Sequence, residues 1–281
     1  MNRRGACIAI GAGALTGGAC ARRPGAPDRH ERTRQALLIG AAAPLLPLVK
    51  ALAAGFLQRH ADVVSTVLVE PGASLPAYIA ASRGAIDMAA MTRALSDAED
   101  GAGARHYLLA RDEIGILVHP ALPLRTLAQA QVRALLDGTI ANWRALGGPD
   151  LPVTVLAPPR AGGMRQDAER LLLDGGEFAV NARECAAAAA LLEALRATPG
   201  AIGCLDGRSR ALVAADGAAM PAIDGVPAAR ETVLSGRYPY VQSFYLLLHG
   251  APDGVSAAFL RFARGAAGQA LVRAHGLVAV C

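Results

Sequence analysis

Several residue types are scarce in this chain of 281 residues. Lysine occurs once, at Lys50, among 28 basic residues, and aromatic residues make up 4% of the chain. No run of basic residues interleaved with aromatics is present, and the formal net charge is a modest +5. A nucleic-acid partner is therefore not expected. We interpret the bias towards alanine and arginine as a property of the genome rather than of the function.

Signatures of catalysis and of metal binding are also missing. The six histidines stand at positions 30, 60, 106, 119, 249 and 275 without ligand spacing, so we expect no metal. No G-x-S-x-G motif occurs, and Ser74 has no evident His or Asp partner. A serine in this position caps a helix far more often than it attacks a substrate. We expect that this protein binds no cofactor and is not an enzyme. The alternative is a hydrolase that uses Ser74.

The N-terminal apolar stretch is too short to span a bilayer. Arg3 and Arg4 precede the apolar residues 6–15, and small residues lead to Cys20, which is typical of an export signal. Residues 1–20 are predicted to be a signal peptide and residues 21–35 a tether. Two fates stay open, lipidation at Cys20 or ordinary cleavage after Ala21. Either one predicts a protein in the periplasm or on the outer face of the cell envelope.

Three cysteines follow the signal, namely Cys185, Cys204 and Cys281, and an odd number leaves at least one unpaired. Cys185 and Cys204 flank a predicted helix over residues 186–197, and an exported protein permits disulfides. Pairing of these two is one hypothesis. Two buried thiols that pack as small hydrophobic side chains are the other.

Apolar strand patterns alternate with helical patterns in the first part of the folded chain. The strand patterns and helical patterns cover, in chain order, residues 37–40, 45–56, 63–69, 75–82 and 85–91. Such alternation predicts a parallel α/β sheet, whose ligands lie at the carboxyl ends of the strands. The strand ends near Ala43, Ser74 and Thr92 are therefore expected to converge.

Residues 137–165 contain a pattern that suits an anion. A strand pattern at residues 151–157 leads through two prolines to Arg160, Gly162 and Gly163, and a helical pattern covers residues 164–173. The free N–H groups and the positive dipole end of such a helix start favour a negatively charged guest. Arg160 and Arg165 flank this junction. The alternative is a tight turn with two solvated arginines.

The same stretch resembles a known family. Residues 138–143, GTIANW, and residues 147–155, GGPDLPVTV, are similar to the G-x-I-x-N-W and G-G-P-D-L-P-I-T-V runs of the phosphate-binding proteins of ABC phosphate-uptake transporters. Similar runs follow at residues 198–203, 223–226, 235–239 and 268–272. The resemblance covers roughly residues 36–281 in the same order.

This resemblance implies an α/β, two-lobe, periplasmic-binding-protein-like (type II) fold with two hinge crossovers. Lobe I would comprise residues 36–116 and 241–281, and lobe II residues 117–240, with hinge closure over a ligand between them. The implied partners are inorganic phosphate or a similar oxyanion and ABC permease subunits. We also expect a monomer, which meets the membrane only if Cys20 carries a lipid anchor.

The family's ligand site can be carried over residue by residue. Ser74 matches the serine of the second turn, and Thr92 and Arg93 match the serine and the charged residue of the third. Residues 161–165 stand where the family has G-S-G-T-R, and Arg160 is a substitute for an arginine expected at Pro158. The expected ligand-binding residues are Ser74, Thr92, Arg93, Arg160, Gly162, Gly163, Arg165 and Ala43.

Hydroxyl groups of the family site are missing at residues 41–44 and 162–164. A buried hydrogen bond to a charged partner contributes about 1.5–3 kcal/mol, so losing several lowers affinity by orders of magnitude. Arg93 has donors only, which predicts a preference for fully ionised or larger anions. The alternative function is a diverged binding-protein fold that acts as an envelope sensor or interaction module.

Overall fold

A mixed β-sheet organises the part of the chain that the computed structural model describes, residues 35–280 apart from 62, 63, 73, 97, 100–102 and 162. The predicted signal peptide with Cys20, residues 21–34 of the tether, Gly162 and Cys281 lie outside the described residues. Among the described helices, none has the length and the apolar character needed to cross a bilayer. We use lobe I and lobe II for the two predicted parts defined above.

The strands of lobe I lie in the order β2-β1-β3-β10-β4, with β11 paired to β4. Strand β1 runs parallel to β2 and β3, while β10 is antiparallel to β3 and β4. The bounds are β1 Gln35–Ala42, β2 Val64–Gly72, β3 Met88–Met91, β4 Ala104–Val118, β10 Val241–His249 and β11 Val278–Ala279. The predicted alternation of strands and helices is therefore observed, and the three parallel strands end at one edge.

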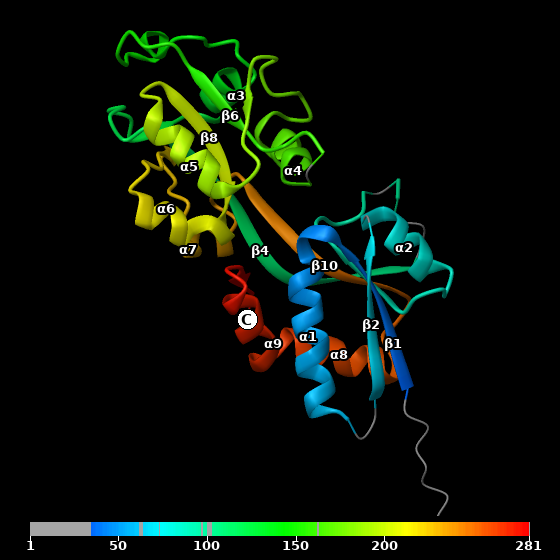
Figure 1. The fold of residues 1–281 in the computed structure, drawn as a ribbon. Helices are drawn as coiled ribbons and strands as arrows, with labels where there is room; N and C mark the ends of the chain where they lie inside the picture. The colour runs from blue at the N-terminus through cyan, green and yellow to red at the C-terminus, as the bar shows by residue number, and fades with distance from the viewer. Residues whose placement is uncertain are drawn as a thin grey trace, which may run out of the picture. The chain divides into compact units, whose positions relative to one another are not determined.

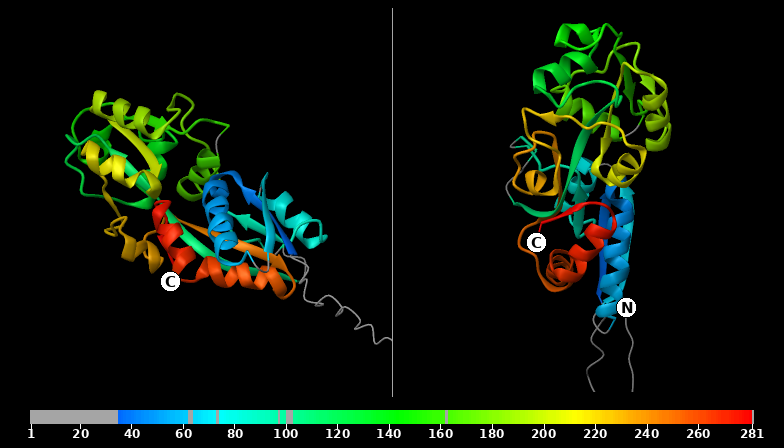
Figure 2. Two further views of the ribbon diagram at one scale, coloured as in Figure 1. Left: turned by 60° about the horizontal axis from the view of Figure 1, so that its bottom comes forward. Right: turned by 90° about the vertical axis from the view of Figure 1, so that its left-hand side faces the viewer.

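Helices cover both faces of this half of the sheet. Met88 and Ala90 of β3 pack in one core cluster and Ala89 and Met91 in another, as expected for side chains that alternate across a strand. The first cluster contains residues of α1 and α8, and the second contains residues of α2; Figure 2 shows α1, α8 and α9 together. The bounds are η1 Ala43–Leu45, α1 Leu46–Arg59, α2 Ser74–Ser82, α8 Gly254–Arg264 and α9 Ala266–Ala274.

Lobe II continues the sheet in the order β8-β6-β7, and its three strands are parallel. A separate pair, β5 and β9, is also parallel. The strands are β5 Thr126–Leu127, β6 Thr154–Ala157, β7 Arg183–Glu184, β8 Ala201–Asp206 and β9 Ala222–Ile223. The helices are α3 Gln129–Leu136, η2 Trp143–Leu146, α4 Gly163–Leu172, α5 Ala188–Ala197, η3 Gly207–Ser209, α6 Arg210–Asp216 and α7 Arg230–Leu234.

Two strands, β4 and β10, run side by side between the two halves (Figure 1). Strand β4 pairs with β10 up to Glu113 and with β8 from Ile114 onwards. The chain returns at Tyr240, whose carbonyl accepts a hydrogen bond of 2.9 Å from the amide of Ile114. The partner change places Asp112 and Glu113 at the crossover, where both side chains are buried.

The hypothesis that Cys185 and Cys204 pair is wrong in this structure, because both are free thiols. The sheet register gives the reason. Cys204 lies in β8 and Cys185 directly follows β7, with β6 between them. Two strand spacings amount to about 10 Å, which is beyond the span of a disulfide. The two side chains also belong to different core clusters, Cys204 with Ala157 and Cys185 with Leu156.

Candidate functional site

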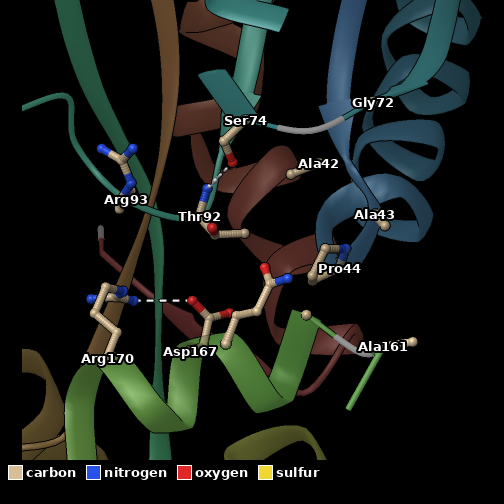
Figure 3. A pocket seen from close by; sticks show the side chains of 12 residues that line it. Ala42, Ala43, Pro44, Gly72, Ser74, Thr92, Arg93, Ala161, Asp167 and Arg170 are labelled. Atoms are coloured by element: carbon tan, nitrogen blue, oxygen red, sulfur yellow. Dashed lines mark hydrogen bonds and ion pairs between the residues drawn. The ribbon is translucent and has the colours of Figure 1, made fainter. Parts of the chain in front are cut away.

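A cavity of about 440 Å³ lies where β1, β2 and β3 end and where one side of α4 faces them (Figure 3). The predicted convergence of the strand ends near Ala43, Ser74 and Thr92 is thus present. Lobe I lines the cavity with Ala42, Ala43, Pro44, Gly72, Ser74, Thr92 and Arg93. Lobe II lines it with Ala161, Gly163, Gln166, Asp167 and Arg170.

Two hydroxyl side chains stand together on the lobe I side. The Ser74 Oγ accepts a hydrogen bond of 3.4 Å from the backbone N–H of Thr92, which ties the start of α2 to the end of β3. A serine hydroxyl that accepts can still donate its own proton. In the described part of the chain the Thr92 hydroxyl has no hydrogen-bond partner. Both groups can therefore donate to an anion in the cavity.

Arg93 forms an ion pair with Glu99, which does not line the cavity. Its two terminal nitrogens donate to the two carboxylate oxygens at 2.6 and 2.7 Å, and one of them also donates to the carbonyl of Ala94 at 2.9 Å. The hydrogen bond from Arg93, followed by that from the Ser96 backbone, lowers the pKa of Glu99 to about 2. A guanidinium has five N–H donors, so these three bonds leave two for a ligand.

One side of helix α4 supplies the lobe II lining apart from Ala161. Gly163, Gln166, Asp167 and Arg170 are spaced as i, i+3, i+4 and i+7, which places them on one helical face. Figure 3 shows Asp167 and Arg170 on the side of α4 that faces Thr92. A terminal nitrogen of Arg170 lies 3.0 Å from Asp167 Oδ1. The lobe II side therefore brings a cation and an anion into the cavity together.

Gln166, Asp167 and Arg170 were not among the residues predicted from sequence. The helical spacing that starts at Gly163 was visible, because a helix over residues 164–173 was expected. A charged helical face is usually solvated, however, so spacing alone does not indicate that the face borders a cavity.

Two predicted arginines lie outside the lining. Arg160 pairs with Glu184 at 3.0 Å, and its side chain is 64% exposed. Arg165 is 4% exposed; its Nε lies 2.5 Å from Glu169, and its guanidinium stacks 4.4 Å from the Phe178 ring centroid. Arg165 follows Gly163 by two residues, about 200° around the helix, and so points to the opposite side.

Of the eight predicted residues, the structure brings five together: Ala43, Ser74, Thr92, Arg93 and Gly163. Gly162 lies outside the described residues. The start of α4 abuts lobe I, since a Cβ on Gly163 would lie 3.5 Å from Pro44 Cγ. Ligand contact by any of the eight residues stays a prediction.

Residues 26–266 match the family model of the PBP superfamily domain. The chain belongs to the PBP superfamily. Among curated proteins it is similar to the phosphate-binding protein PstS of Bacillus subtilis (strain 168), with 25% identity over 83% of this chain and 76% of that protein.

Solved structures of this superfamily share the fold. PstS from Borrelia burgdorferi superposes with a TM-score of 0.81 at 18% identity, over 88% of this chain and 99% of that chain. An ABC-type phosphate transport receptor from Vibrio cholerae gives 0.80 at 20% identity, over 87% and 99%. The predicted α/β, two-lobe, periplasmic-binding-protein-like fold with two crossovers is confirmed. The signal peptide, the lipid anchor and the monomeric state stay predictions.

Proposed function

We propose that this protein captures phosphate or a related oxyanion in the cavity and delivers it to an ABC permease. The observation that supports this most directly is the pair of arginines, Arg93 and Arg170, which border one cavity from opposite lobes. Arginine donors in a fork suit the oxygens of a tetrahedral anion. Similarity to the phosphate-binding protein PstS of Bacillus subtilis supports the same ligand class.

Asp167 refines the ligand preference. A carboxylate accepts hydrogen bonds, so it favours an anion that still carries a proton and repels one that does not. Hydrogen phosphate has an O–H donor, whereas sulfate has none at neutral pH. The sequence alone favoured a fully ionised anion because Arg93 offers donors only. With Asp167 in the same lining, we propose that hydrogen phosphate is preferred over sulfate.

Calorimetric titration of the full chain tests this function. Phosphate, sulfate, molybdate and glycerol phosphate are titrated separately at pH 7.5, with thermal unfolding as a second readout. We expect heat and a raised melting temperature with phosphate, and weaker effects with sulfate. If none of the four anions gives heat or a thermal shift, the proposed function is wrong.

We also infer a binding protein rather than an enzyme. Among the described residues, the Ser74 hydroxyl contacts the backbone amide of Thr92. An amide N–H cannot act as the base that removes the hydroxyl proton during a nucleophilic attack. We expect no hydrolysis of an aryl phosphate ester. Turnover that disappears in Ser74→Ala would contradict this inference.

A second candidate is the envelope sensor or interaction module without a transported ligand. It is favoured by the first turn, where Ala42, Ala43 and Pro44 offer no hydroxyl, and by the carboxylate partners that both lining arginines already have. A folded protein that binds no oxyanion would support this candidate. For either function we infer a place outside the cytoplasm, in the periplasm or on the outer face of the envelope. Fractionation of cells that express the full chain tests this location.

A further inference from the structure

Arg208 connects the crossover strand with the cavity. It lies in η3, directly after β8, on the lobe II side of the crossover. One terminal nitrogen lies 2.6 Å from Asp206 Oδ2, and Nε lies 3.4 Å from Asp112 Oδ2. The other terminal nitrogen donates to the carbonyl of Pro44 at 3.0 Å. The two terminal nitrogens therefore donate hydrogen bonds to Asp206 and to Pro44, whereas Nε lies near Asp112 without a hydrogen-bond partner among the described residues, and Pro44 belongs to the cavity lining.

The stem of Arg208 is also in contact with lobe I. Gly276 follows α9 and has a φ of +75°. A Cβ on Gly276 would lie 3.1 Å from Arg208 Cα and 3.5 Å from Arg208 Cβ. One residue of lobe II thus lies against two separate segments of lobe I, the turn at Pro44 and the turn at Gly276.

Two buried carboxyl groups lie next to Gly207, the residue that precedes this arginine. Asp112 and Glu113 are 1% and 3% exposed, and Glu113 pairs with Arg210. A Cβ on Gly207 would lie 2.5 Å from Asp112 Oδ1 and 2.6 Å from Glu113 Oε1, so the backbone passes directly over both carboxylates. Burial, and next the Asp206 charge, raise the pKa of Asp112 to about 8. Asp206 is accordingly the main charged partner of Arg208 at neutral pH.

We propose that Arg208 is a positioning residue for ligand capture, because it holds the turn at Pro44 in the arrangement that completes the cavity. The inference rests on the proposed function and names a residue that does not itself line the cavity. The forked shape of arginine is essential to this role. A lysine keeps the charge but has a single nitrogen in place of the two terminal nitrogens that donate separately to Asp206 and to Pro44.

The test compares Arg208→Lys with Arg210→Lys in the full chain. Arg210 is the matched control because it pairs with a buried carboxylate of the same crossover and no described contact joins it to Pro44. Amide hydrogen exchange at residues 43, 45 and 46, which flank Pro44, is measured without ligand. We expect exchange there to become at least tenfold faster in Arg208→Lys and to stay unchanged in Arg210→Lys. Equal exchange in the two variants would overturn the inference.

Phosphate affinity is the second readout. We expect Arg208→Lys to weaken binding at least tenfold and Arg210→Lys to change it less than twofold, at comparable melting temperatures. A wild-type protein that binds no anion would refute the proposed function, while the exchange data would still decide whether Arg208 holds the turn. Wild-type affinity in a folded Arg208→Lys protein would refute the positioning role. If that variant does not fold, Asp206→Asn takes its place, with the same amides expected to exchange faster.

Discussion

The two sides of the cavity are constructed differently. Lobe I contributes the turns that follow three strands, at Ala42–Pro44, at Gly72 and Ser74, and at Thr92 and Arg93. Lobe II contributes Ala161 and one face of a single helix, α4. The lobe I lining therefore depends on where the strands end, and the lobe II lining depends on the rotation of a helix about its axis.

Charge also differs between the two sides. Glu99, the partner of Arg93, does not line the cavity, whereas Asp167, the partner of Arg170, does. The lobe I side thus presents a cation alone, and the lobe II side presents a cation beside an anion. We infer that lobe I provides most of the attraction for an anion and that lobe II decides which anion is accepted.

The prediction with the largest expected effect tests which side of α4 faces the cavity and which side is buried. Arg165→Gln is expected to lower the free energy of unfolding by about 3 kcal/mol, because it leaves Glu169 without its partner and removes the guanidinium from the Phe178 ring. Arg160→Gln, which breaks an exposed pair, is expected to change it by less than about 1 kcal/mol. Urea unfolding of both variants measures this. Similar losses in the two would contradict the assignment of opposite sides.

The attraction attributed to lobe I is tested next. Arg93→Gln removes the two guanidinium N–H donors that are not bonded to Glu99 or Ala94. It is expected to weaken phosphate binding by about 100-fold, or about 2.7 kcal/mol. Arg105→Gln is the control, since Arg105 is exposed in lobe I and has no ion pair among the described residues. Calorimetry measures both. A loss of less than threefold in Arg93→Gln would assign the attraction elsewhere.

The selectivity attributed to lobe II gives a smaller change. Asp167→Asn removes the carboxylate acceptor, so the preference for phosphate over sulfate is expected to fall about tenfold, or about 1.4 kcal/mol. The measurement is competition between the two anions at pH 7.5. An unchanged preference would mean that Asp167 does not meet the ligand.

The last prediction concerns the crossover that joins the two sides, and it is a dependence on pH rather than a change in one value. The pKa of Asp112 is about 8 in the folded protein against an ordinary value of 3.8, because of burial and of Asp206. The folded state therefore keeps a proton that the unfolded chain has lost. This stabilisation is fully present below the unfolded pKa and is lost as the pH rises through the folded pKa of about 8.

Wild-type stability is accordingly expected to fall relative to Asp112→Asn by at most about 1.4 kcal/mol for each pH unit between pH 5 and pH 8. Urea unfolding of the two proteins at several pH values measures the difference. A difference that stays constant with pH would show that Asp112 keeps its ordinary pKa when folded.

Much of the fold could be predicted because periodic patterns report local structure. The stripe of Leu48, Leu52 and Phe56 predicts α1, and these side chains are buried as expected. The helix predicted over residues 164–173 is α4, Gly163–Leu172. Cysteine pairing could not be predicted in the same way, because the separation of Cys185 and Cys204 depends on β6, which enters the sheet between β7 and β8.

The candidate site was likewise predictable in part from the sequence and in part only from the tertiary structure. The order of strands and turns along the chain determined that Ala43, Ser74 and Thr92 would meet, because parallel strands end at one edge. Only the tertiary structure decided which face of α4 borders the cavity, and hence that Asp167 and Arg170 line it while Arg165 is buried. The physical reason is that strand direction follows from connectivity, whereas the rotation of a helix is set by the core it packs against.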